Sequence, residues 1–258
     1  MSTARLYLFL LAGVLFVAGC GQDRSNSSSA RSATNPSPPQ TTNRAASASA
    51  SDTTSKSGLR VLVLGNSIAA GLGVSSDAAF PARLQRKVDS LGWNVTVQNA
   101  GVSGETTAGG RSRIGWLLNE EVDVLVLELG GNDGLRGVDL QSTKQNLQAI
   151  IDTTIATYPA SQVLLAGMQI PPNLGPEYTE KFRELYPAVA QQYDRVRLIP
   201  FVLQDVATVD SLMQSDGIHP TAAGHRIVAN NVWKQLHPIL ERMREQEAAS
   251  RGQANVQR

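Results

Sequence analysis

From Leu59 onward the chain alternates short apolar runs with longer stretches in which apolar residues recur at helical spacing. Short runs dominated by Val, Leu and Ile, bounded by glycine or polar residues, predict buried strands. We expect five strands, at residues 60–64, 93–97, 123–129, 162–166 and 196–200. The helical spacing predicts helices at residues 80–91, 108–119, 140–157 and 178–192, and a last helix from Thr221 onward.

This order of elements predicts an α/β fold with a parallel sheet covered by helices on both faces. Ligands of such sheets bind beyond the carboxyl ends of the strands. Four polar clusters fall in the predicted loops, and the first three of them directly follow apolar strands. The clusters are Asn66-Ser67, Ser103-Gly104-Glu105, Asn132-Asp133 and the segment from Asp216 to His219. We therefore expect the four clusters to converge on one edge of the sheet.

The N-terminal residues 1–19 have the pattern of a signal peptide. Arg5 precedes an apolar stretch at residues 6–18, which is too short to span a bilayer but suits a signal-peptide core. The stretch ends in Val-Ala-Gly followed by Cys20, the single cysteine of the chain. This segment resembles a bacterial lipobox, whose cysteine is lipidated and becomes the mature N-terminus. An ordinary signal peptide with a chance cysteine is the alternative.

Composition divides the remainder of the chain into three parts. Residues 20–58 are rich in Ser, Thr, Ala and Pro, and residues 21–57 hold no large apolar side chain. Such a segment buries too little surface to offset its ordering entropy, so we expect a disordered tether. Residues 59–240 carry the predicted domain, and residues 241–258 form a charged tail that extends or frays the last helix.

The charge of the chain gives no support to a nucleic-acid partner. Of the formal net charge of +1, Arg5 contributes one positive charge and residues 21–57 contribute two, which leaves −2 for residues 58–258. No long run of Lys or Arg is present. A near-neutral domain without a basic patch lacks the electrostatic footprint of a nucleic-acid-binding protein.

Ser67 is a candidate nucleophile because it follows a predicted strand and Gly65. A strand-to-helix turn presents a side chain above the sheet and points backbone N–H groups at it, as a nucleophile and its oxyanion require. A serine in such a turn is by itself more often a helix cap. The segment from Gly65 to Ala69 does not match the G-x-S-x-G elbow of α/β-hydrolases.

His219 is the candidate general base. Asp216 lies three residues before it, and in a tight turn its carboxylate can reach the imidazole Nδ1 and leave Nε2 free. Without a serine partner, a cap or turn role for His219 would be equally plausible. The other two histidines, His225 and His237, fall within the last predicted helix and are expected to be structural or solvated.

Asn132 and Gly104 are candidate oxyanion donors. Asn132 follows two glycines at the end of the strongest strand, where its amide can donate to a developing negative charge. Gly104 can offer its backbone N–H without interference from a Cβ. Turn formation by Asn-Asp-Gly is the structural alternative. The glycine spacing matches no dinucleotide or phosphate loop, and no metal-ligand motif is present, so we expect no metal.

Taken together, the blocks resemble those of the SGNH (GDSL-type) hydrolases. The resemblance covers about residues 60–238 and is closest to the bacterial arylesterase, acyl-CoA thioesterase and lysophospholipase group, which also carries a run similar to residues 167–173. The blocks are Gly65-Asn66-Ser67, residues 99–107, Gly130-Gly131-Asn132-Asp133 and residues 216–221. The resemblance implies a flavodoxin-like three-layer α/β/α sandwich with a five-stranded parallel sheet and a mechanism that needs no cofactor.

The resemblance also implies a role for each block. Ser67 would be the nucleophile, His219 the general base and Asp216 the residue that orients it. The backbone N–H groups of Ser67 and Gly104 and the Asn132 amide would form the oxyanion hole. One position departs from the family pattern, because the first block usually reads Gly-Asp-Ser and position 66 is Asn here. We expect Asn66 to alter local hydrogen bonding without abolishing activity.

These roles predict a serine esterase that cleaves aryl or short-to-medium acyl esters, and possible substrates include lysophospholipids. A thioesterase or a glycan O-deacetylase is the alternative within enzymes, and a non-catalytic binding lipoprotein is the alternative outside them. We expect a monomer attached to the membrane through Cys20. Gly21 does not supply the Asp that often retains lipoproteins at the inner membrane, which favours the periplasmic side of the outer membrane.

Overall fold

The computed structural model describes residues 58–256. The predicted signal peptide, Cys20 and nearly all of the predicted tether lie outside the described residues. Five parallel strands form one sheet in the order β2-β1-β3-β4-β5. The strands are β1 (Leu59–Gly65), β2 (Val95–Asn99), β3 (Val124–Glu128), β4 (Gln162–Ala166) and β5 (Val196–Ile199).

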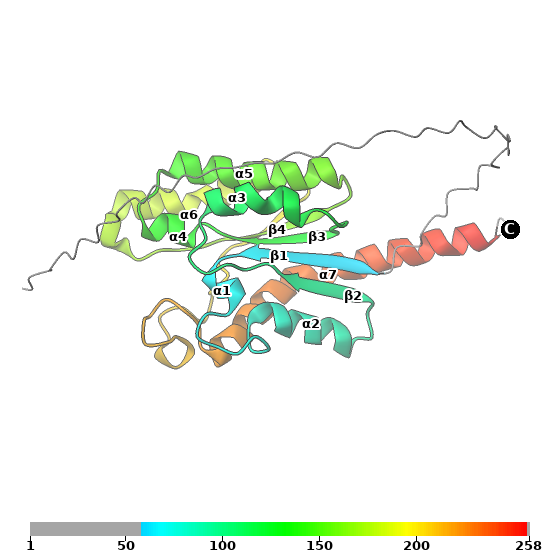
Figure 1. The fold of residues 1–258 in the computed structure, drawn as a ribbon, viewed down its shortest axis with the longest axis horizontal. Helices are drawn as coiled ribbons and strands as arrows, with labels where there is room; N and C mark the ends of the chain where they lie inside the picture. Colours follow the sequence, from blue (N-terminus) through cyan, green and yellow to red (C-terminus); the bar gives the residue numbers. More distant parts are fainter. Residues whose placement is uncertain (1–57, 257–258) are drawn as a thin grey trace, which may run out of the picture. The chain divides into compact units, whose positions relative to one another are not determined.

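Helices cover both faces of the sheet (Figure 1). One face is covered by α3 (Thr107–Leu117), α5 (Leu140–Thr157) and α6 (Pro176–Ala190), and the other by α2 (Phe80–Ser90) and α7 (Ala222–Val256). Short helical segments lie in the loops: α1 (Ser67–Ala70), α4 (Gly131–Leu135), η1 (Pro172–Leu174) and η2 (Asp210–Leu212). This arrangement confirms the predicted three-layer α/β/α fold with a five-stranded parallel sheet.

The central strands are apolar along their whole length because both of their faces are covered. Every residue of β3 is buried, and so is every residue of β1 except Arg60. Continuous burial on two faces is typical of a parallel strand between helical layers. The strand order reverses direction at β1, since β2 lies on one side of it and β3 on the other. In sheets of this kind, ligands bind at the carboxyl ends of the strands beside such a switch point.

The prediction for β2 was wrong by two residues. Gly92 adopts a left-handed backbone, with a φ of 64°, and the Trp93 N–H donates to the Val88 carbonyl at 3.1 Å, so Trp93 belongs to the turn that follows α2. Its ring lies against Trp233 and His237 of α7, with ring centroids 6.2 and 5.1 Å away. The alternating pattern was therefore continued by a residue that packs between helices instead of in the sheet.

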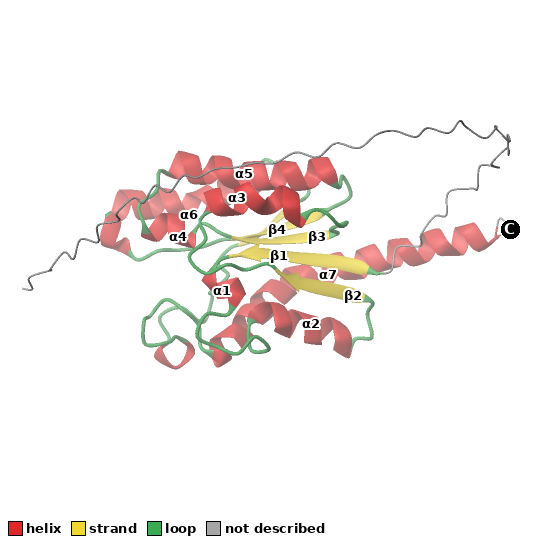
Figure 2. Cartoon of the chain, viewed as in Figure 1, coloured by secondary structure: helices red, strands yellow, loops and turns green. Residues whose placement is uncertain are grey.

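The last helix continues through the segment predicted as a charged tail. Ile239 and Leu240 are buried, and the Arg244 guanidinium lies 4.4 Å from the centroid of the Trp93 ring. The first turn of that segment therefore packs on the domain, whereas the end of α7 projects past the amino ends of the strands (Figure 2). Among the described residues, no helix is long and apolar enough to cross a membrane.

Candidate active site

The nucleophile candidate lies in a one-turn helix at the carboxyl end of β1. Asn66 caps α1, because its Oδ1 accepts a hydrogen bond from the Ile68 N–H at 2.9 Å. Gly71 ends the turn with a φ of 77°, which a residue with a side chain rarely adopts. Ser67 is the first residue of this helix and is only 8% exposed. The loop expected after β1 is therefore an ordered turn of helix.

Ser67, His219 and Asp216 form a continuous chain of hydrogen bonds. The Ser67 Oγ lies 2.8 Å from the His219 Nε2, and the His219 Nδ1 lies 2.6 Å from the Asp216 Oδ2. Both distances are within the hydrogen-bond reach that proton transfer requires. Residues that are 152 positions apart in the chain thus meet at one point, and the imidazole has one nitrogen on the serine and the other on the carboxylate.

Asp216 is held by the turn that it shares with His219. Its Oδ1 accepts hydrogen bonds from the Ile218 N–H at 2.9 Å and the His219 N–H at 3.0 Å. The His219 N–H, the His219 imidazole and the Ile218 N–H together lower the pKa of Asp216 to about 2. Asp216 is therefore ionised over the working pH range of most enzymes and can orient the imidazole and stabilise its positive charge.

The oxyanion candidates face the same edge of the sheet. Neither the Ser67 N–H nor the Gly104 N–H has a hydrogen-bond acceptor among the residues that the structure describes. The Asn132 Nδ2 donates to the Glu105 carbonyl at 2.9 Å, a contact that the sequence pattern did not indicate. An amide nitrogen carries two hydrogens, so this bond fixes the amide and leaves one N–H for a ligand.

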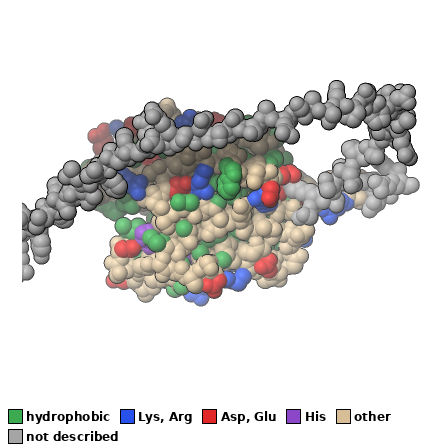
Figure 3. All heavy atoms as spheres, in the orientation of Figure 1, with side chains coloured by type: hydrophobic (Ala, Val, Ile, Leu, Met, Phe, Trp, Pro, Cys, Tyr) green, Lys and Arg blue, Asp and Glu red, His purple; other side chains and the backbone are tan. Residues whose placement is uncertain are grey.

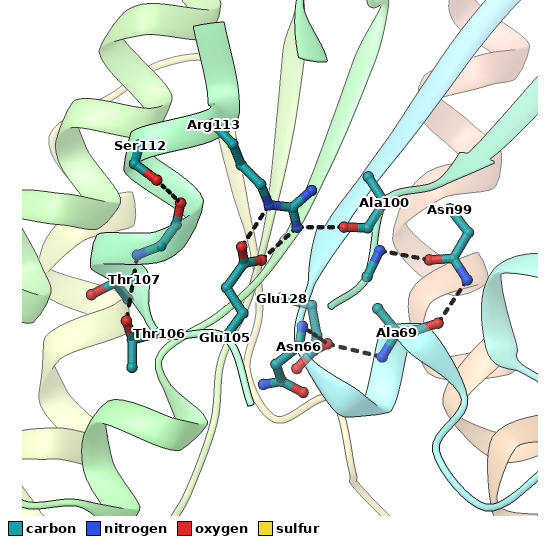
Figure 4. Close-up of polar contacts among 12 residues, drawn as sticks. Asn66, Ala69, Asn99, Ala100, Glu105, Thr106, Thr107, Ser112, Arg113 and Glu128 are labelled. Atoms are coloured by element: carbon teal, nitrogen blue, oxygen red, sulfur yellow. Dashed lines mark hydrogen bonds and ion pairs between the residues drawn. The ribbon is translucent and has the colours of Figure 1, made fainter. Parts of the chain in front are cut away.

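An ion pair that the sequence analysis missed holds the loop around Gly104 (Figure 4). Arg113 of α3 contacts both carboxylate oxygens of Glu105 at 2.5 Å and also donates to the Ala100 carbonyl at 2.5 Å. The Glu105 side chain is only 6% exposed. Glu105 therefore supports Asn132 through its carbonyl and the loop through its carboxylate. Helical spacing placed Arg113 on α3 but did not indicate its partner.

Glu128 is a second residue that the sequence analysis missed. It ends β3 and is fully buried, and its Oε2 accepts hydrogen bonds from the backbone N–H groups of Asn66 and Ala69, both at 3.2 Å. The available signal was a single carboxylate within an otherwise apolar strand, since Lys, Glu, Arg and Asp are rarely buried without a reason.

Gln214 connects the loop that carries His219 to the nucleophile turn. Its Nε2 donates to the Leu72 carbonyl at 2.7 Å and to the Pro220 carbonyl at 2.9 Å. Its Oε1 lies so close to Gly73 that a Cβ at that position would collide with it. Nothing in the local pattern around Gln214 indicates this bridge, because its partner lies 142 residues earlier.

The remaining histidines lie outside the triad, as expected. His225 of α7 is fully buried, and neither ring nitrogen has a hydrogen-bond partner in the described part of the chain. Burial, followed by the positive charge of Arg83, lowers the pKa of His225 to about 4, so its ring is neutral. His237 packs against Trp93 and Trp233. Within residues 58–256 no three His, Cys, Asp or Glu side chains gather as a metal site would require.

The chain is similar to a known family and to known proteins over most of the described residues. The model of the GDSL-like Lipase/Acylhydrolase family matches residues 63–227. The chain is 44% identical over 181 residues to Esterase TesA of Pseudomonas aeruginosa, covering 70% of this chain and 89% of that protein. It is 39% identical to Thioesterase 1/protease 1/lysophospholipase L1 of Escherichia coli K12, covering 70% of this chain and 84% of the relative.

Two solved structures support the likeness. The crystal structure of TesA shares 42% identity and a TM-score of 0.66, and the match covers 70% of this chain and 99% of that one. The psychrotrophic esterase EstA of Pseudoalteromonas sp., solved with monoethylphosphonate as an inhibitor, shares 28% identity and a TM-score of 0.66, covering 70% and 98% of the two chains.

Proposed function

The chain belongs to the GDSL-like lipase/acylhydrolase family and is a serine ester hydrolase, and we propose that Ser67 is its nucleophile, His219 its general base and Asp216 the residue that orients the base. The observation that carries the proposal is the pair of hydrogen bonds from Ser67 through His219 to Asp216. In the proposed reaction, no other residue among those described moves a proton.

The proposed reaction proceeds through an acyl-enzyme. The His219 Nε2 takes the proton of the Ser67 hydroxyl while Oγ forms a bond to the ester carbonyl carbon. Collapse of the tetrahedral intermediate breaks the bond to the alcohol oxygen, which receives the proton from His219. Water then gives a proton to His219 and attacks the acyl carbon, and release of the acid returns the proton to Ser67. Asp216 stays ionised throughout.

The oxyanion of each tetrahedral intermediate would be bound by three donors. We assign these to the Ser67 N–H, the Gly104 N–H and the second hydrogen of the Asn132 amide. The first two point to an edge where the described chain offers them no acceptor, and the third is oriented by the Glu105 carbonyl. Preorganised donors of this kind stabilise developing charge without reorganising during the reaction.

Apolar side chains around the triad support a substrate with an apolar acyl or aryl group. Large hydrophobic residues are exposed in the segments that follow the carboxyl ends of β1, β2, β3 and β4 and in the turn that carries His219, and Figure 3 shows apolar side chains beside a histidine and an acidic group on one face. These residues are Leu72, Val102, Leu135, Leu174 and Ile218. We propose aryl esters, short-to-medium acyl esters and lysophospholipids as substrates. Thioester cleavage is the second candidate, because one relative is named a thioesterase as well as a lysophospholipase.

We further propose that the enzyme works as a monomer outside the inner membrane, attached by a lipid on Cys20. The support is the lipobox-like sequence at residues 17–20. Acyl-CoA is scarce there, so the physiological substrate would be an extracytoplasmic ester. Fractionation of wild type and Cys20→Ser tests the anchor: esterase activity should move from the membrane to the soluble fraction, and activity that is soluble in both would refute it.

A fluorophosphonate probe tests the nucleophile directly. It should label the wild-type enzyme on Ser67, as located by peptide mapping, and should not label Ser67→Ala. Ser103→Ala is the matched control, because Ser103 is more exposed than Ser67 and lies near the same edge but has no histidine partner among the described hydrogen bonds. Labelling that persists in Ser67→Ala and disappears in Ser103→Ala would overturn the assignment.

A further inference from the structure

Glu128 lies directly behind the nucleophile turn. It pairs with Gly65 in the register of β3 with β1, and its carboxyl group extends under the junction of β1 and α1. A Cβ at Gly65 would lie 2.6 Å from the Glu128 Oε2, so only glycine leaves room for the carboxyl group at this position. The carboxyl group makes no hydrogen bond to His219 or Asp216, and the triad does not use it.

The hydrogen bonds of Glu128 determine which donor of the turn remains available. Helices begin with backbone N–H groups that have no partner within the helix. At the start of α1, Glu128 accepts from the N–H groups of Asn66 and Ala69, and the Asn66 side chain accepts from Ile68. The Ser67 N–H is the one donor of this set without an acceptor in the described chain. It is also the donor assigned to the oxyanion.

The second oxygen of Glu128 lacks the hydrogen bonds or paired cation that a buried negative charge requires. Oε1 is buried and has no hydrogen-bond partner among the described residues. Burial raises the pKa of Glu128 to about 8, although the N–H groups of Asn66 and Ala69 and the Asn66 side chain oppose the increase. The Glu105 carboxylate, paired with Arg113, raises the pKa further, and the Tyr186 phenol on α6 also interacts with Glu128.

We propose that Glu128 is a positioning residue for Ser67 that acts in its uncharged form, and that loss of its Oε1 proton to solvent base turns the enzyme off. This inference rests on the proposed function of Ser67. A negative charge on Glu128 would lie behind the turn whose N–H must stabilise the oxyanion, and charges of the same sign repel strongly in a buried site. Turnover should therefore fall above about pH 8, although the base His219 is neutral and competent there.

The test is the pH profile of kcat/KM for wild type and Glu128→Gln. Glutamine keeps the shape of the neutral acid, and its amide oxygen can accept from Asn66 and Ala69 while its NH₂ replaces Oε1. We expect the wild-type profile to fall by about tenfold per pH unit above its alkaline midpoint, as a single ionisation requires. The Glu128→Gln profile should remain flat over that range, and its rate near pH 7 should stay within about tenfold of wild type.

Tyr186→Phe is the matched control. Tyr186 is also buried and donates to the Leu129 carbonyl at 3.0 Å next to Glu128, and its pKa lies well above the ordinary value of 10 because of burial. This variant should keep the alkaline decline. The proposal is wrong if Glu128→Gln keeps the decline, if wild type shows none, or if Tyr186→Phe removes it.

Two measurements on the wild-type enzyme test the proposal even if a variant fails to fold. Infrared spectra of the wild-type enzyme should show a buried carboxylic acid band that disappears with the same midpoint as the activity, and a band absent at pH 7 would overturn the proposal without any variant. The unfolding free energy of wild type should decrease between the unfolded pKa of 4.5 and about pH 8, because the folded state retains the proton. Failure of Ser67 labelling at pH 7 would instead refute the proposed function.

Discussion

Ser67 and the oxyanion donors follow the neighbouring strands β1, β2 and β3, whereas Asp216 and His219 lie in the long loop between β5 and α7. The strand-borne half of the site, which comprises Ser67 and the oxyanion donors, is held by the register of the sheet, by the buried carboxyl group of Glu128 and by the partly buried Arg113 side chain. In the other half the Asp216 side chain is 44% exposed and most of its contacts are local, within one turn.

The two halves also shift the pKa of a carboxyl group in opposite directions. Burial raises the pKa of Glu128 to about 8, whereas hydrogen bonds in an exposed turn lower the pKa of Asp216 to about 2. A neutral acid behind the nucleophile avoids repelling the oxyanion, and an ionised acid behind the histidine stabilises the imidazolium. The comparison indicates that the strand-borne half provides rigidity and the loop-borne half provides charge.

The largest expected effect comes from removing either half of the triad. Ser67→Ala and His219→Ala should each lower kcat by at least about 10⁴-fold, because nucleophile and base act as one unit. The double variant should be no slower than either single variant. Steady-state kinetics with circular dichroism as a folding control checks this prediction. Additive losses would show that the two halves contribute independently.

Asn132→Ala tests the strand-borne half alone. It should lower kcat by about 10² to 10³-fold with little change in KM, as expected when one oxyanion donor is lost. Asn230→Ala is the control, since Asn230 is exposed on α7 away from the triad. A rise in KM at unchanged kcat would mean that Asn132 binds the substrate and does not stabilise the oxyanion.

Gln214→Ala breaks the bridge between the halves. Loss of its bonds to the carbonyls of Leu72 and Pro220 should let the His219 loop shift against the turn, and kcat should fall by roughly tenfold, because small misplacements are costly in catalysis. Gln204→Ala changes the same loop without crossing to the turn, since its side chain contacts the neighbouring Asp205. Equal rates for both variants would mean that the bridge is dispensable.

The smallest effect on turnover is expected at His225. Its folded pKa of about 4 lies below the unfolded value of 6.5, so its stabilising contribution is complete above pH 6.5 and is lost as the pH falls through 4. His225→Leu should retain activity at pH 8 and should lose less unfolding free energy on acidification, by at most about 3 kcal/mol. Denaturant titrations at several pH values measure this difference, and identical slopes would exclude His225 as the cause.

Much of the fold was predictable because periodicity reports burial. The predicted bounds of α5 and β4 agree with the structure, and β1, β3 and β5 differ by at most one residue at each end. The apolar pattern mispredicted an element where a residue packs against a helix and not in the sheet, or where the element is very short. Trp93 continues an alternating run but packs against α7, and the one-turn helices α1 and α4 are too short to show a helical period.

By itself the sequence determined the fold class and the candidates Ser67, Asp216, His219, Gly104 and Asn132, because strand ends, turn residues and motif order are local properties. Only the tertiary structure decided which donor of the nucleophile turn stays available and what supports it. Glu128 reaches that turn across a strand pair, and Gln214 reaches it across 142 residues of chain. Such contacts depend on strand order and loop closure, and burial then sets the charge of Glu128, which no local pattern contains.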